Sequence, residues 1–156
     1  MYKRQDYYDG AIPSGNSAAI YCLFKLGKIT GNREWINIAH ETLKAFSEQA
    51  KSNPTGFTCM LTGLMFDPKS CKELIIVIDR NKHNCKSILY KIKKEYFPNF
   101  IINVKDINDK DLVENISPWI DSYMVINDKP SYFVCTNFTC KQPTNCLLYT
   151  SPSPRD

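Results

Sequence analysis

The first half of the chain carries apolar side chains at helical spacing. Between residues 16 and 52 they recur at steps of three and four, which places them on one face of an α-helix. The pattern predicts a helical hairpin that turns at Thr30-Gly31-Asn32 and ends at Asn53-Pro54. A third helix is expected over 58–66, where apolar residues on nearly all sides predict burial. The two faces of the hairpin consist of Ile20, Leu23, Phe24 and Gly27 in the first helix, and of Trp35, Ile38, Ala39, Thr42, Leu43, Phe46 and Ala50 in the second.

After Asp67-Pro68 continuous apolar runs replace this spacing. Residues 74–78 and 100–104 are rich in β-branched side chains, which is typical of parallel strands buried on both faces. Helical spacing between these runs completes a predicted βαβ unit, and shorter runs at 123–126 and 132–135 predict a β-hairpin. The sequence therefore predicts an α+β fold. The apolar face of the helix in the βαβ unit consists of Cys85, Ile88, Leu89, Ile92 and Tyr96, and the hairpin turn of Asn127, Asp128, Lys129 and Pro130.

The composition is that of a folded globular protein, with 43% hydrophobic and 12% aromatic residues. The 20 basic and 16 acidic side chains give a formal net charge of +4. Lys91, Lys93 and Lys94 fall on the polar side of the predicted helix, and we interpret them as a solvated face. No segment approaches the roughly 20 apolar residues that cross a bilayer. We therefore expect no nucleic-acid partner and no membrane partner.

Both ends of the chain resemble a translated transposase sequencing adapter. Residues 146–156 resemble the adapter in one frame, and residues 1–5 resemble its inverted end in another. This hypothesis leaves residues 6–145 as the biological sequence and removes three basic side chains and one acidic one, so the net charge falls from +4 to +2. The alternative is a short natural N-terminus and a natural Ser/Pro-rich tail.

Three stretches match one protein family in order and spacing. Residues 9–17 read D-G-A-I-P-S-G-N-S, residues 133–140 read F-V-C-T-N-F-T-C, and the predicted strand–helix–strand segment 73–104 lies between them. They resemble the D-G-A-x-P-S-G-N-S motif, the Y-V-C-x-N-F-x-C motif and the intervening segment of a large family of thioredoxin-domain proteins. Its animal members are called spermatogenesis-associated proteins. The resemblance covers most of residues 6–143, and Phe133 stands where the family usually has Tyr.

The resemblance implies an N-terminal thioredoxin-like domain followed by an (α/α) toroid like those of six-hairpin glycosidases and sugar epimerases. Residues 6–70 would then be the terminal helical hairpins of the toroid, and residues 71–145 a C-terminal α/β segment. The thioredoxin-like domain and the earlier toroid helices would be missing parts of the same chain. The implied function is binding or processing of a sugar-like small molecule, with the full protein acting as a hydrolase or isomerase. The alternative is a scaffold or interaction part of a thiol-redox or chaperone-like protein, without chemistry in this region.

The loop at 9–16 holds the candidate site of the toroid. By the resemblance, Asp9 would be a carboxylate at the toroid mouth and is the candidate catalytic residue, although glycoside hydrolysis needs a pair of carboxylates. Asp9, Ser14 and Asn16 are the candidate ligand-binding residues. The alternative is that the loop is a turn in which Ser14 or Asn16 caps the following helix.

The cysteines divide into packing residues and one candidate redox pair. Cys22 and Cys85 fall on apolar helix faces, where a free cysteine packs as a small hydrophobe, and we expect a reducing, cytoplasmic environment. Cys135 and Cys140 are separated by four residues, whereas dithiol redox motifs prefer two. We expect both thiols to be reduced and structural, and a redox pair is the alternative. Without Cys146 the six cysteines are Cys22, Cys59, Cys71, Cys85, Cys135 and Cys140.

No metal site and no cofactor are expected. Zinc would need two ligands besides the cysteine pair, and the only histidines are His40, expected to pack or cap, and His83, expected to open the helix of the βαβ unit. No Gly-rich phosphate loop follows the strand at 74–78, which argues against a dinucleotide site of the usual kind. Asp79 closes that strand at a position where α/β sheets bind ligands, and the simplest interpretation is that it solvates the strand end.

Overall fold

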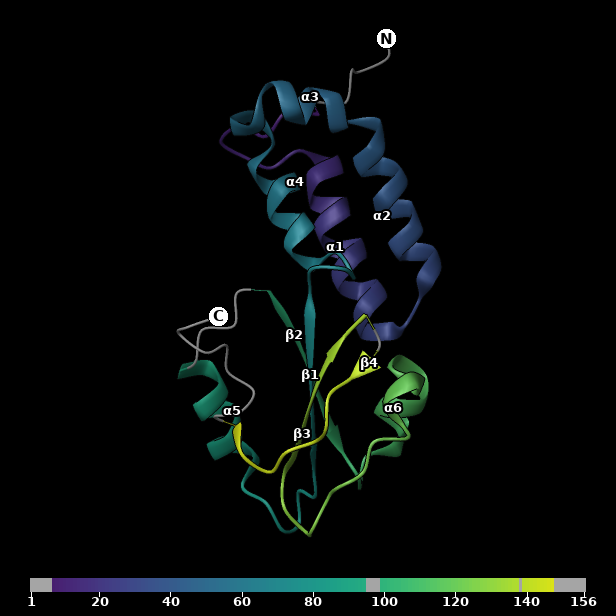
Figure 1. Ribbon diagram of the computed structural model, residues 1–156, viewed down its shortest axis with the longest axis vertical. Helices are drawn as coiled ribbons and strands as arrows, with labels where there is room; N and C mark the ends of the chain where they lie inside the picture. Colours follow the sequence, from purple (N-terminus) through teal and green to yellow (C-terminus); the bar gives the residue numbers. More distant parts are fainter. Residues whose placement is uncertain (1–6, 95–98, 138, 148–156) are drawn as a thin grey trace. The chain divides into compact units, whose positions relative to one another are not determined.

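The structure is a computed structural model in which residues 7–94, 99–137 and 139–147 are described. The chain divides into two compact units, Met1–Ser70 and Cys71–Asp156, shown in Figure 1. The predictions for residues 1–5 and 148–156, and for Tyr96 on the helix of the βαβ unit, lie outside the described residues.

The first unit is helical. Its two long helices are α1 (Gly15–Thr30) and α2 (Arg33–Ala45), followed by α3 (Ser47–Ser52) and α4 (Thr58–Gly63). Two 3₁₀ turns, η1 (Pro54–Phe57) and η2 (Leu64–Phe66), flank α4. Figure 1 shows α1 between α2 and α4, and it packs against both.

The turn between α1 and α2 follows from residues with local conformational preferences. Gly31 ends α1 at φ 75°, a left-handed conformation that costs glycine little. The Asn32 side chain then accepts hydrogen bonds from the amides of Glu34 and Trp35 and caps α2. The predicted break at Thr30-Gly31-Asn32 is confirmed.

The buried faces of the hairpin differ in part from the predicted ones. In α1, Ile20, Phe24 and Gly27 are buried as predicted. In α2, Ile36 and Ala39 are buried, whereas Ile38 is 45% exposed, so its predicted burial is wrong. The cause is a close approach of the helices, since a Cβ atom at Gly27 would lie 2.6 Å from Cγ1 of Ile36.

Three further predictions for this unit need correction. The second helix is interrupted at Phe46, whose amide donates to the Leu43 carbonyl, and it resumes as α3. The third helical segment is not buried all round, because Leu61 and Met65 are 37% and 38% exposed. Cys22 is exposed, although it was expected on the apolar face of its helix.

The second unit is a four-stranded mixed sheet in the order β2-β1-β3-β4. Strand β1 (Lys72–Ile78) pairs parallel with β2 (Phe100–Asp106) and antiparallel with β3 (Ser131–Thr136), which pairs with β4 (Thr139–Cys140). Because α5 (Cys85–Lys94) connects β1 to the parallel strand β2 in the sequence, the predicted βαβ unit is confirmed.

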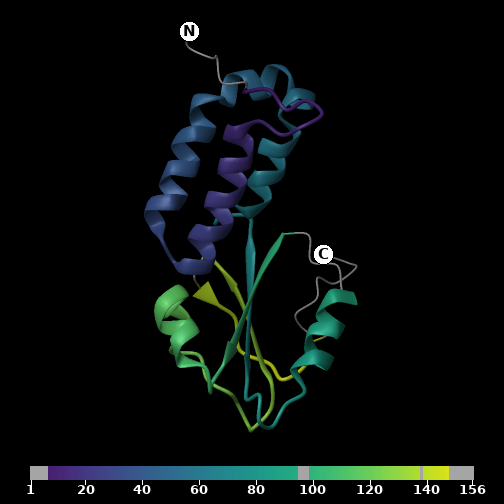
Figure 2. The same ribbon diagram turned by 180° about the vertical axis from the view of Figure 1, so that it is seen from behind.

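Each face of this sheet has its own apolar core. Leu74, Ile76 and Ile78 of β1 pack with Ile92 of α5. The alternate residues Ile75 and Val77 point to the opposite face of the sheet. There they pack with Val113 of α6 (Lys110–Ile116) and Ile120 of the 3₁₀ turn η3 (Pro118–Ile120). Figure 2 shows α5 and α6 on opposite sides of the sheet, which explains why β1 is buried on both faces.

The predicted hairpin is wrong in its pairing, although its turn is present. Asn127 and Asp128 have φ values of 54° and 53°, and the Lys129 amide donates to the Ile126 carbonyl. Ile126 and Lys129 form an isolated β-bridge, but residues 123–126 form no strand, and β3 pairs with β1 instead. Hydrogen bonds elsewhere hold this segment, because the Ile126 amide donates to the Ser131 hydroxyl.

Candidate functional site

Asp9 is buried in the first unit and joins the starts of two helices. Its Oδ1 accepts a hydrogen bond from the Ser14 amide at 2.8 Å, ahead of α1. Its Oδ2 accepts from the amides of Cys59 and Met60 in α4, at 2.9 and 3.3 Å. Burial raises the pKa of Asp9, but these hydrogen bonds and one with Ser17 outweigh it and hold the pKa below its ordinary value. Both oxygens therefore serve local structure.

Ser14 caps α1, as one of the two alternatives predicted. Its Oγ accepts from the Ser17 amide at 3.2 Å and lies 2.9 Å from the Ser17 hydroxyl. Asn16 is not the cap; its side chain is partly exposed in the first turn of α1.

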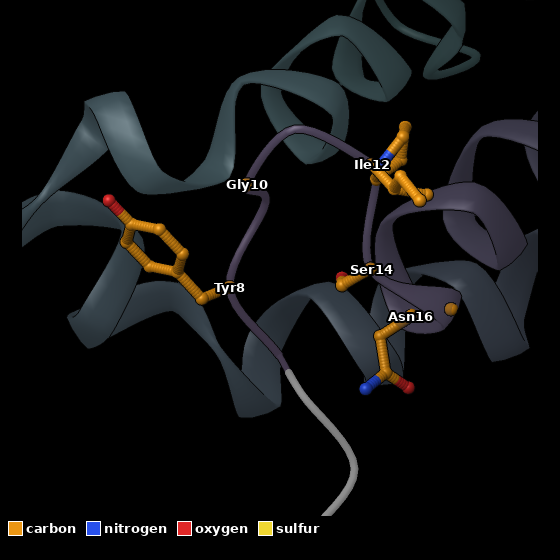
Figure 3. Close-up of a pocket in the computed structure, with 7 residues that line it drawn as sticks. Tyr8, Gly10, Ile12, Ser14 and Asn16 are labelled. Carbon is orange, nitrogen blue, oxygen red and sulfur yellow. The ribbon is translucent and has the colours of Figure 1, made fainter.

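A pocket of about 800 Å³ lies beside this loop. Figure 3 shows Tyr8 on one limb of the loop and Ser14 and Asn16 on the other. Asp9 is not among the lining residues, so the structure brings Ser14 and Asn16 to the pocket without the carboxylate. The pocket is lined by Tyr8, Gly10, Ile12, Pro13, Ser14, Gly15 and Asn16.

Tyr8 forms the aromatic wall of this pocket and was not identified from the sequence. Tyr8 is 50% exposed, and its ring packs edge-on against Phe57 at a centroid distance of 6.4 Å. The opposite contact is with Gly56, where any Cβ atom would overlap the ring. Since Gly56 lies far along the chain from Tyr8, no local pattern indicates this packing.

Cys135 and Cys140 form a disulfide, which corrects the expectation that both are reduced. The two residues are register partners of the antiparallel strands β3 and β4. The hairpin turn, with Asn137 at φ 50°, brings them opposite one another. Spacing alone did not predict the bond because a pair separated by four residues meets only if the chain reverses between them.

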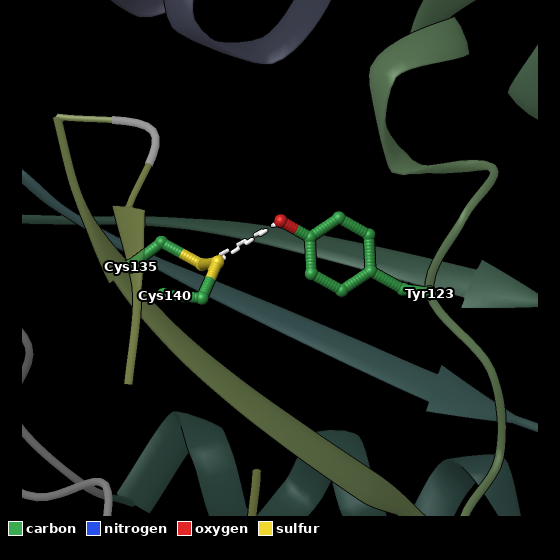
Figure 4. Close-up of a disulfide and its surroundings, with 3 residues drawn as sticks. All are labelled: Tyr123, Cys135 and Cys140. Carbon is green, nitrogen blue, oxygen red and sulfur yellow. Dashed lines mark hydrogen bonds between the residues drawn. A yellow bond between two sulfur atoms is a disulfide. The ribbon is translucent and has the colours of Figure 1, made fainter. Parts of the chain in front are cut away.

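Tyr123 accompanies the disulfide and was not identified as a site residue from the sequence. Its hydroxyl lies 2.9 Å from Sγ of Cys140 and 3.9 Å from Sγ of Cys135 (Figure 4). The ring is held edge-on by Phe133 at 4.9 Å and by Trp119 at 6.3 Å. Burial, and secondarily a nearby carboxylate, raise the pKa of the Tyr123 phenol.

The carboxyl ends of β1 and β2 form a separate polar cluster. Asp79 and Asp106 are both buried there, and the Asn108 side-chain amide donates to them at 2.8 and 3.1 Å. Burial raises the pKa of Asp106, but hydrogen bonds from Asn108 and Arg80 outweigh it and hold the pKa below its ordinary value. The hydrogen bonds of Asp79 therefore stabilise the loop that follows β1. Asp106 was not identified from the sequence, although it ends the second strand as Asp79 ends the first.

The two histidines have structural partners. Nε2 of His40 lies 2.6 Å from Oδ2 of Asp67, and its ring packs edge-on against Phe24, as expected for a packing residue. His83 does not open α5. Its Nδ1 accepts from the Asp79 amide at 3.0 Å, which leaves Nε2 to donate to the Asp128 carbonyl at 3.0 Å. Asn84 caps α5 instead.

Metal and membrane features are assessed over residues 7–94, 99–137 and 139–147. No three His, Cys, Asp or Glu side chains in these ranges are grouped so that they could hold a metal ion. No helix in the same ranges has both the length and the apolar character to span a membrane.

Comparison with known proteins supports the family resemblance. The chain is 27% identical over 139 residues to human spermatogenesis-associated protein 20, and 25% and 26% identical to the rat and mouse proteins. These matches cover 89% of this chain but only 18% of each relative. No protein-family model and no solved structure matches the chain.

Proposed function

We propose that the loop at 8–16 contributes to the binding of a sugar-like small molecule in a protein related to spermatogenesis-associated protein 20. The observation that carries this proposal is the pocket of about 800 Å³ beside the loop, which combines an exposed aromatic ring with a polar amide. In the family architecture, this loop would lie at the mouth of the (α/α) toroid.

The chemistry of the pocket suits a ligand with apolar faces and many hydroxyls. Binding pockets commonly combine aromatic surface with a few polar groups that orient the ligand. Tyr8 is a half-exposed aromatic residue, and Asn16 offers an amide that can both donate and accept hydrogen bonds. A sugar presents C–H groups to the first and hydroxyls to the second.

The hydrogen bonds of Asp9 favour binding over proton transfer in this loop. The carboxylate accepts from three backbone amides, and its lowered pKa disfavours the protonated form that a general acid requires. We therefore propose Tyr8 and Asn16, with Ser14 beside them, as ligand contacts, and Asp9 as the residue that shapes the loop.

A second candidate function is that of a scaffold without ligand chemistry. The observation that favours it is the same set of Asp9 hydrogen bonds, because they show that the motif residues fold the unit. Under this alternative the whole protein is a thiol-redox or chaperone-like protein, and the loop only joins α1 to α4.

Calorimetric titration of the full chain with a panel of mono- and disaccharides separates the two candidates. A sugar that binds should lose about tenfold in affinity on Tyr8→Ala or Asn16→Ala, which corresponds to about 1.4 kcal/mol for one lost contact. Tyr90→Ala is the matched control, since Tyr90 is an exposed tyrosine of the other unit. Absence of binding across the panel supports the scaffold. Equal affinities in all three variants would show that a bound sugar does not contact this loop and would overturn the proposal.

A further inference from the structure

The Cys135–Cys140 disulfide joins two sulfurs in different environments. Cys135 lies on β3 within the sheet and is fully buried. Cys140 lies on β4 at the edge of the sheet and is partly exposed. An incoming thiolate must reach one sulfur along the axis of the bond, so access favours attack at Cys140.

A hydroxyl group is directed at the sulfur of Cys140, the more exposed of the two cysteines. Figure 4 shows the Tyr123 hydroxyl pointing toward the disulfide, 2.9 Å from Sγ of Cys140 and 1 Å farther from Sγ of Cys135, at 3.9 Å. The Tyr123 ring is fixed between Phe133 and Trp119, so the hydroxyl is held in place. A phenol in this position can donate a hydrogen bond to a Cys140 thiolate.

A side chain from the sheet holds the backbone of the segment that carries Tyr123. Lys105 of β2 is buried and its Nζ donates to the backbone carbonyls of Asp121 and Tyr123. On the neighbouring strand, Glu73 is fully buried and is the register partner of Cys135. Burial, and secondarily the charge of Glu73, raise the pKa of Tyr123. A phenol is protonated at neutral pH in any case, so the Tyr123 hydroxyl can donate.

We propose that Cys135 and Cys140 form a redox-active pair that exchanges with a low-molecular-weight thiol, with Cys140 as the exchanging sulfur and Tyr123 as its hydrogen-bond donor. The exchange site is independent of the sugar-binding proposal, because it lies in the other unit.

The exchange balances with two molecules of thiol. The first thiolate attacks Sγ of Cys140, a bond forms between these sulfurs, and the bond to Cys135 breaks with its electron pair left on Cys135. The second thiolate attacks the sulfur of the bound thiol, releases it as a small disulfide, and leaves Cys140 as a thiolate next to Tyr123. The two protons of the small thiols end on Cys135 and Cys140. Two thiols are thereby oxidised and one protein disulfide is reduced.

The first experiment tests whether the pair reacts in the folded protein. The oxidised full chain is incubated with reduced glutathione in native buffer, free thiols are alkylated, and each cysteine peptide is quantified by mass spectrometry. We expect Cys135 and Cys140 to become alkylated together while circular dichroism shows that the fold is retained. If the pair is reduced only at denaturant concentrations that unfold the protein, it is structural and the proposal is overturned.

The second experiment tests which sulfur exchanges. Cys135→Ser leaves Cys140 alone, and Cys140→Ser leaves Cys135 alone. Each variant is incubated with oxidised glutathione, and the adduct on the remaining cysteine is measured relative to the adduct on exposed Cys22, an internal reference. We expect the adduct to form on Cys140 at least about tenfold faster than on Cys135. Equal rates, or faster reaction of Cys135, overturn the assignment.

The third experiment tests Tyr123. Tyr123→Phe in the Cys135→Ser background removes the hydroxyl and keeps the ring that packs on Phe133. At neutral pH we expect adduct formation on Cys140, relative to Cys22, to fall about threefold, because the lost thiolate fraction is partly offset by higher nucleophilicity. A ratio unchanged from that of Cys135→Ser alone would overturn the role of Tyr123, and a stability effect alone does not change this ratio.

Discussion

Asp9 of the D-G-A-I-P-S-G-N-S motif accepts hydrogen bonds from three backbone amides. It is 6% exposed. Its carboxylate accepts from the amide of Ser14, five residues away in the sequence, and from that of Cys59, 50 residues away. A buried carboxylate is costly unless its oxygens are hydrogen-bonded, and here both are. The motif is therefore explained by folding before any ligand is considered.

Asp9→Asn should destabilise the protein by about 1–3 kcal/mol at pH 7, because one carboxylate oxygen becomes an amide nitrogen that faces backbone N–H donors. The lowered pKa of Asp9 means that the folded state binds its proton less readily than the unfolded state. The stabilisation is therefore complete above the ordinary pKa of about 4, and is lost as pH falls from there through the folded pKa.

Urea unfolding of wild type and Asp9→Asn at a series of pH values measures this difference. Glu41→Gln, an exposed carboxylate on α2, is the control and should change stability little at any pH. A difference between wild type and Asp9→Asn that stays constant from pH 7 down to pH 3 would contradict the role of ionised Asp9.

At this scale the sequence predicted roles that depend on near neighbours. The Ser14 cap was one of two stated alternatives because an N-cap acts within three residues. The contacts of Asp9 with Cys59 and of Tyr123 with Cys140 were not predicted, since each depends on how distant segments are packed. From the sequence the Cys135–Cys140 pair is only an alternative, because the two cysteines meet only if the chain turns at Asn137, and the structure has this turn.

At the scale of elements, the contact between α1 and α2 depends on a missing side chain. Gly27 lets Ile36 approach, and the same approach rotates Ile38 toward solvent. Periodicity identified both helices but not the direction of the α2 face, because an apolar stripe wider than the contact leaves several rotations open. Tertiary packing at one glycine selects among them.

Gly27→Ala should destabilise the first unit by about 1–3 kcal/mol, despite the better helix propensity of alanine, because its Cβ would lie 2.6 Å from Cγ1 of Ile36. Gly15→Ala in the same helix is the matched control, since nothing lies within 4 Å of a Cβ there. Thermal unfolding followed by circular dichroism compares the two. A Gly27→Ala variant as stable as Gly15→Ala would show that the helices can separate without cost.

Both predicted parallel strands are present, but only one is buried on both faces. The run at 74–78 lies in β1, whose burial on both faces leaves a continuous apolar signal. The run at 100–104 lies in the edge strand β2, where Ile102 is 36% exposed, so its predicted burial on both faces is wrong. Residues 123–126 have a similar local signal but form no strand. Lys105 donates hydrogen bonds to the backbone carbonyls of Asp121 and Tyr123. These carbonyls are therefore already occupied by a side chain at the start of this segment.

At the scale of the whole molecule, the chain combines two units with different kinds of core. The first unit packs short and long helices around α1, and several large apolar side chains remain exposed, including Ile38, Leu61 and Met65. The second unit is centred on β1, whose residues from Glu73 to Ile78 are buried.

Native-state hydrogen exchange should resolve the two units as separate cooperative bodies. The amides of residues 74–77 should exchange most slowly in the chain, because β1 is hydrogen-bonded on both sides and covered on both faces. Ile76→Val removes one buried methylene equivalent from the second unit and should lower the free energy of exchange of these amides by about 0.5–1.5 kcal/mol.

The same substitution should leave the slowest amides of α1 unchanged, since that helix belongs to the first unit. Gly27→Ala provides the reciprocal measurement and should lower the protection of α1 while leaving that of β1 unchanged. Equal shifts in both units after either substitution would show that the chain unfolds as one cooperative body. Faster exchange in β1 than in α1 would instead show that the helical unit, and not the sheet, is the more stable part of this protein.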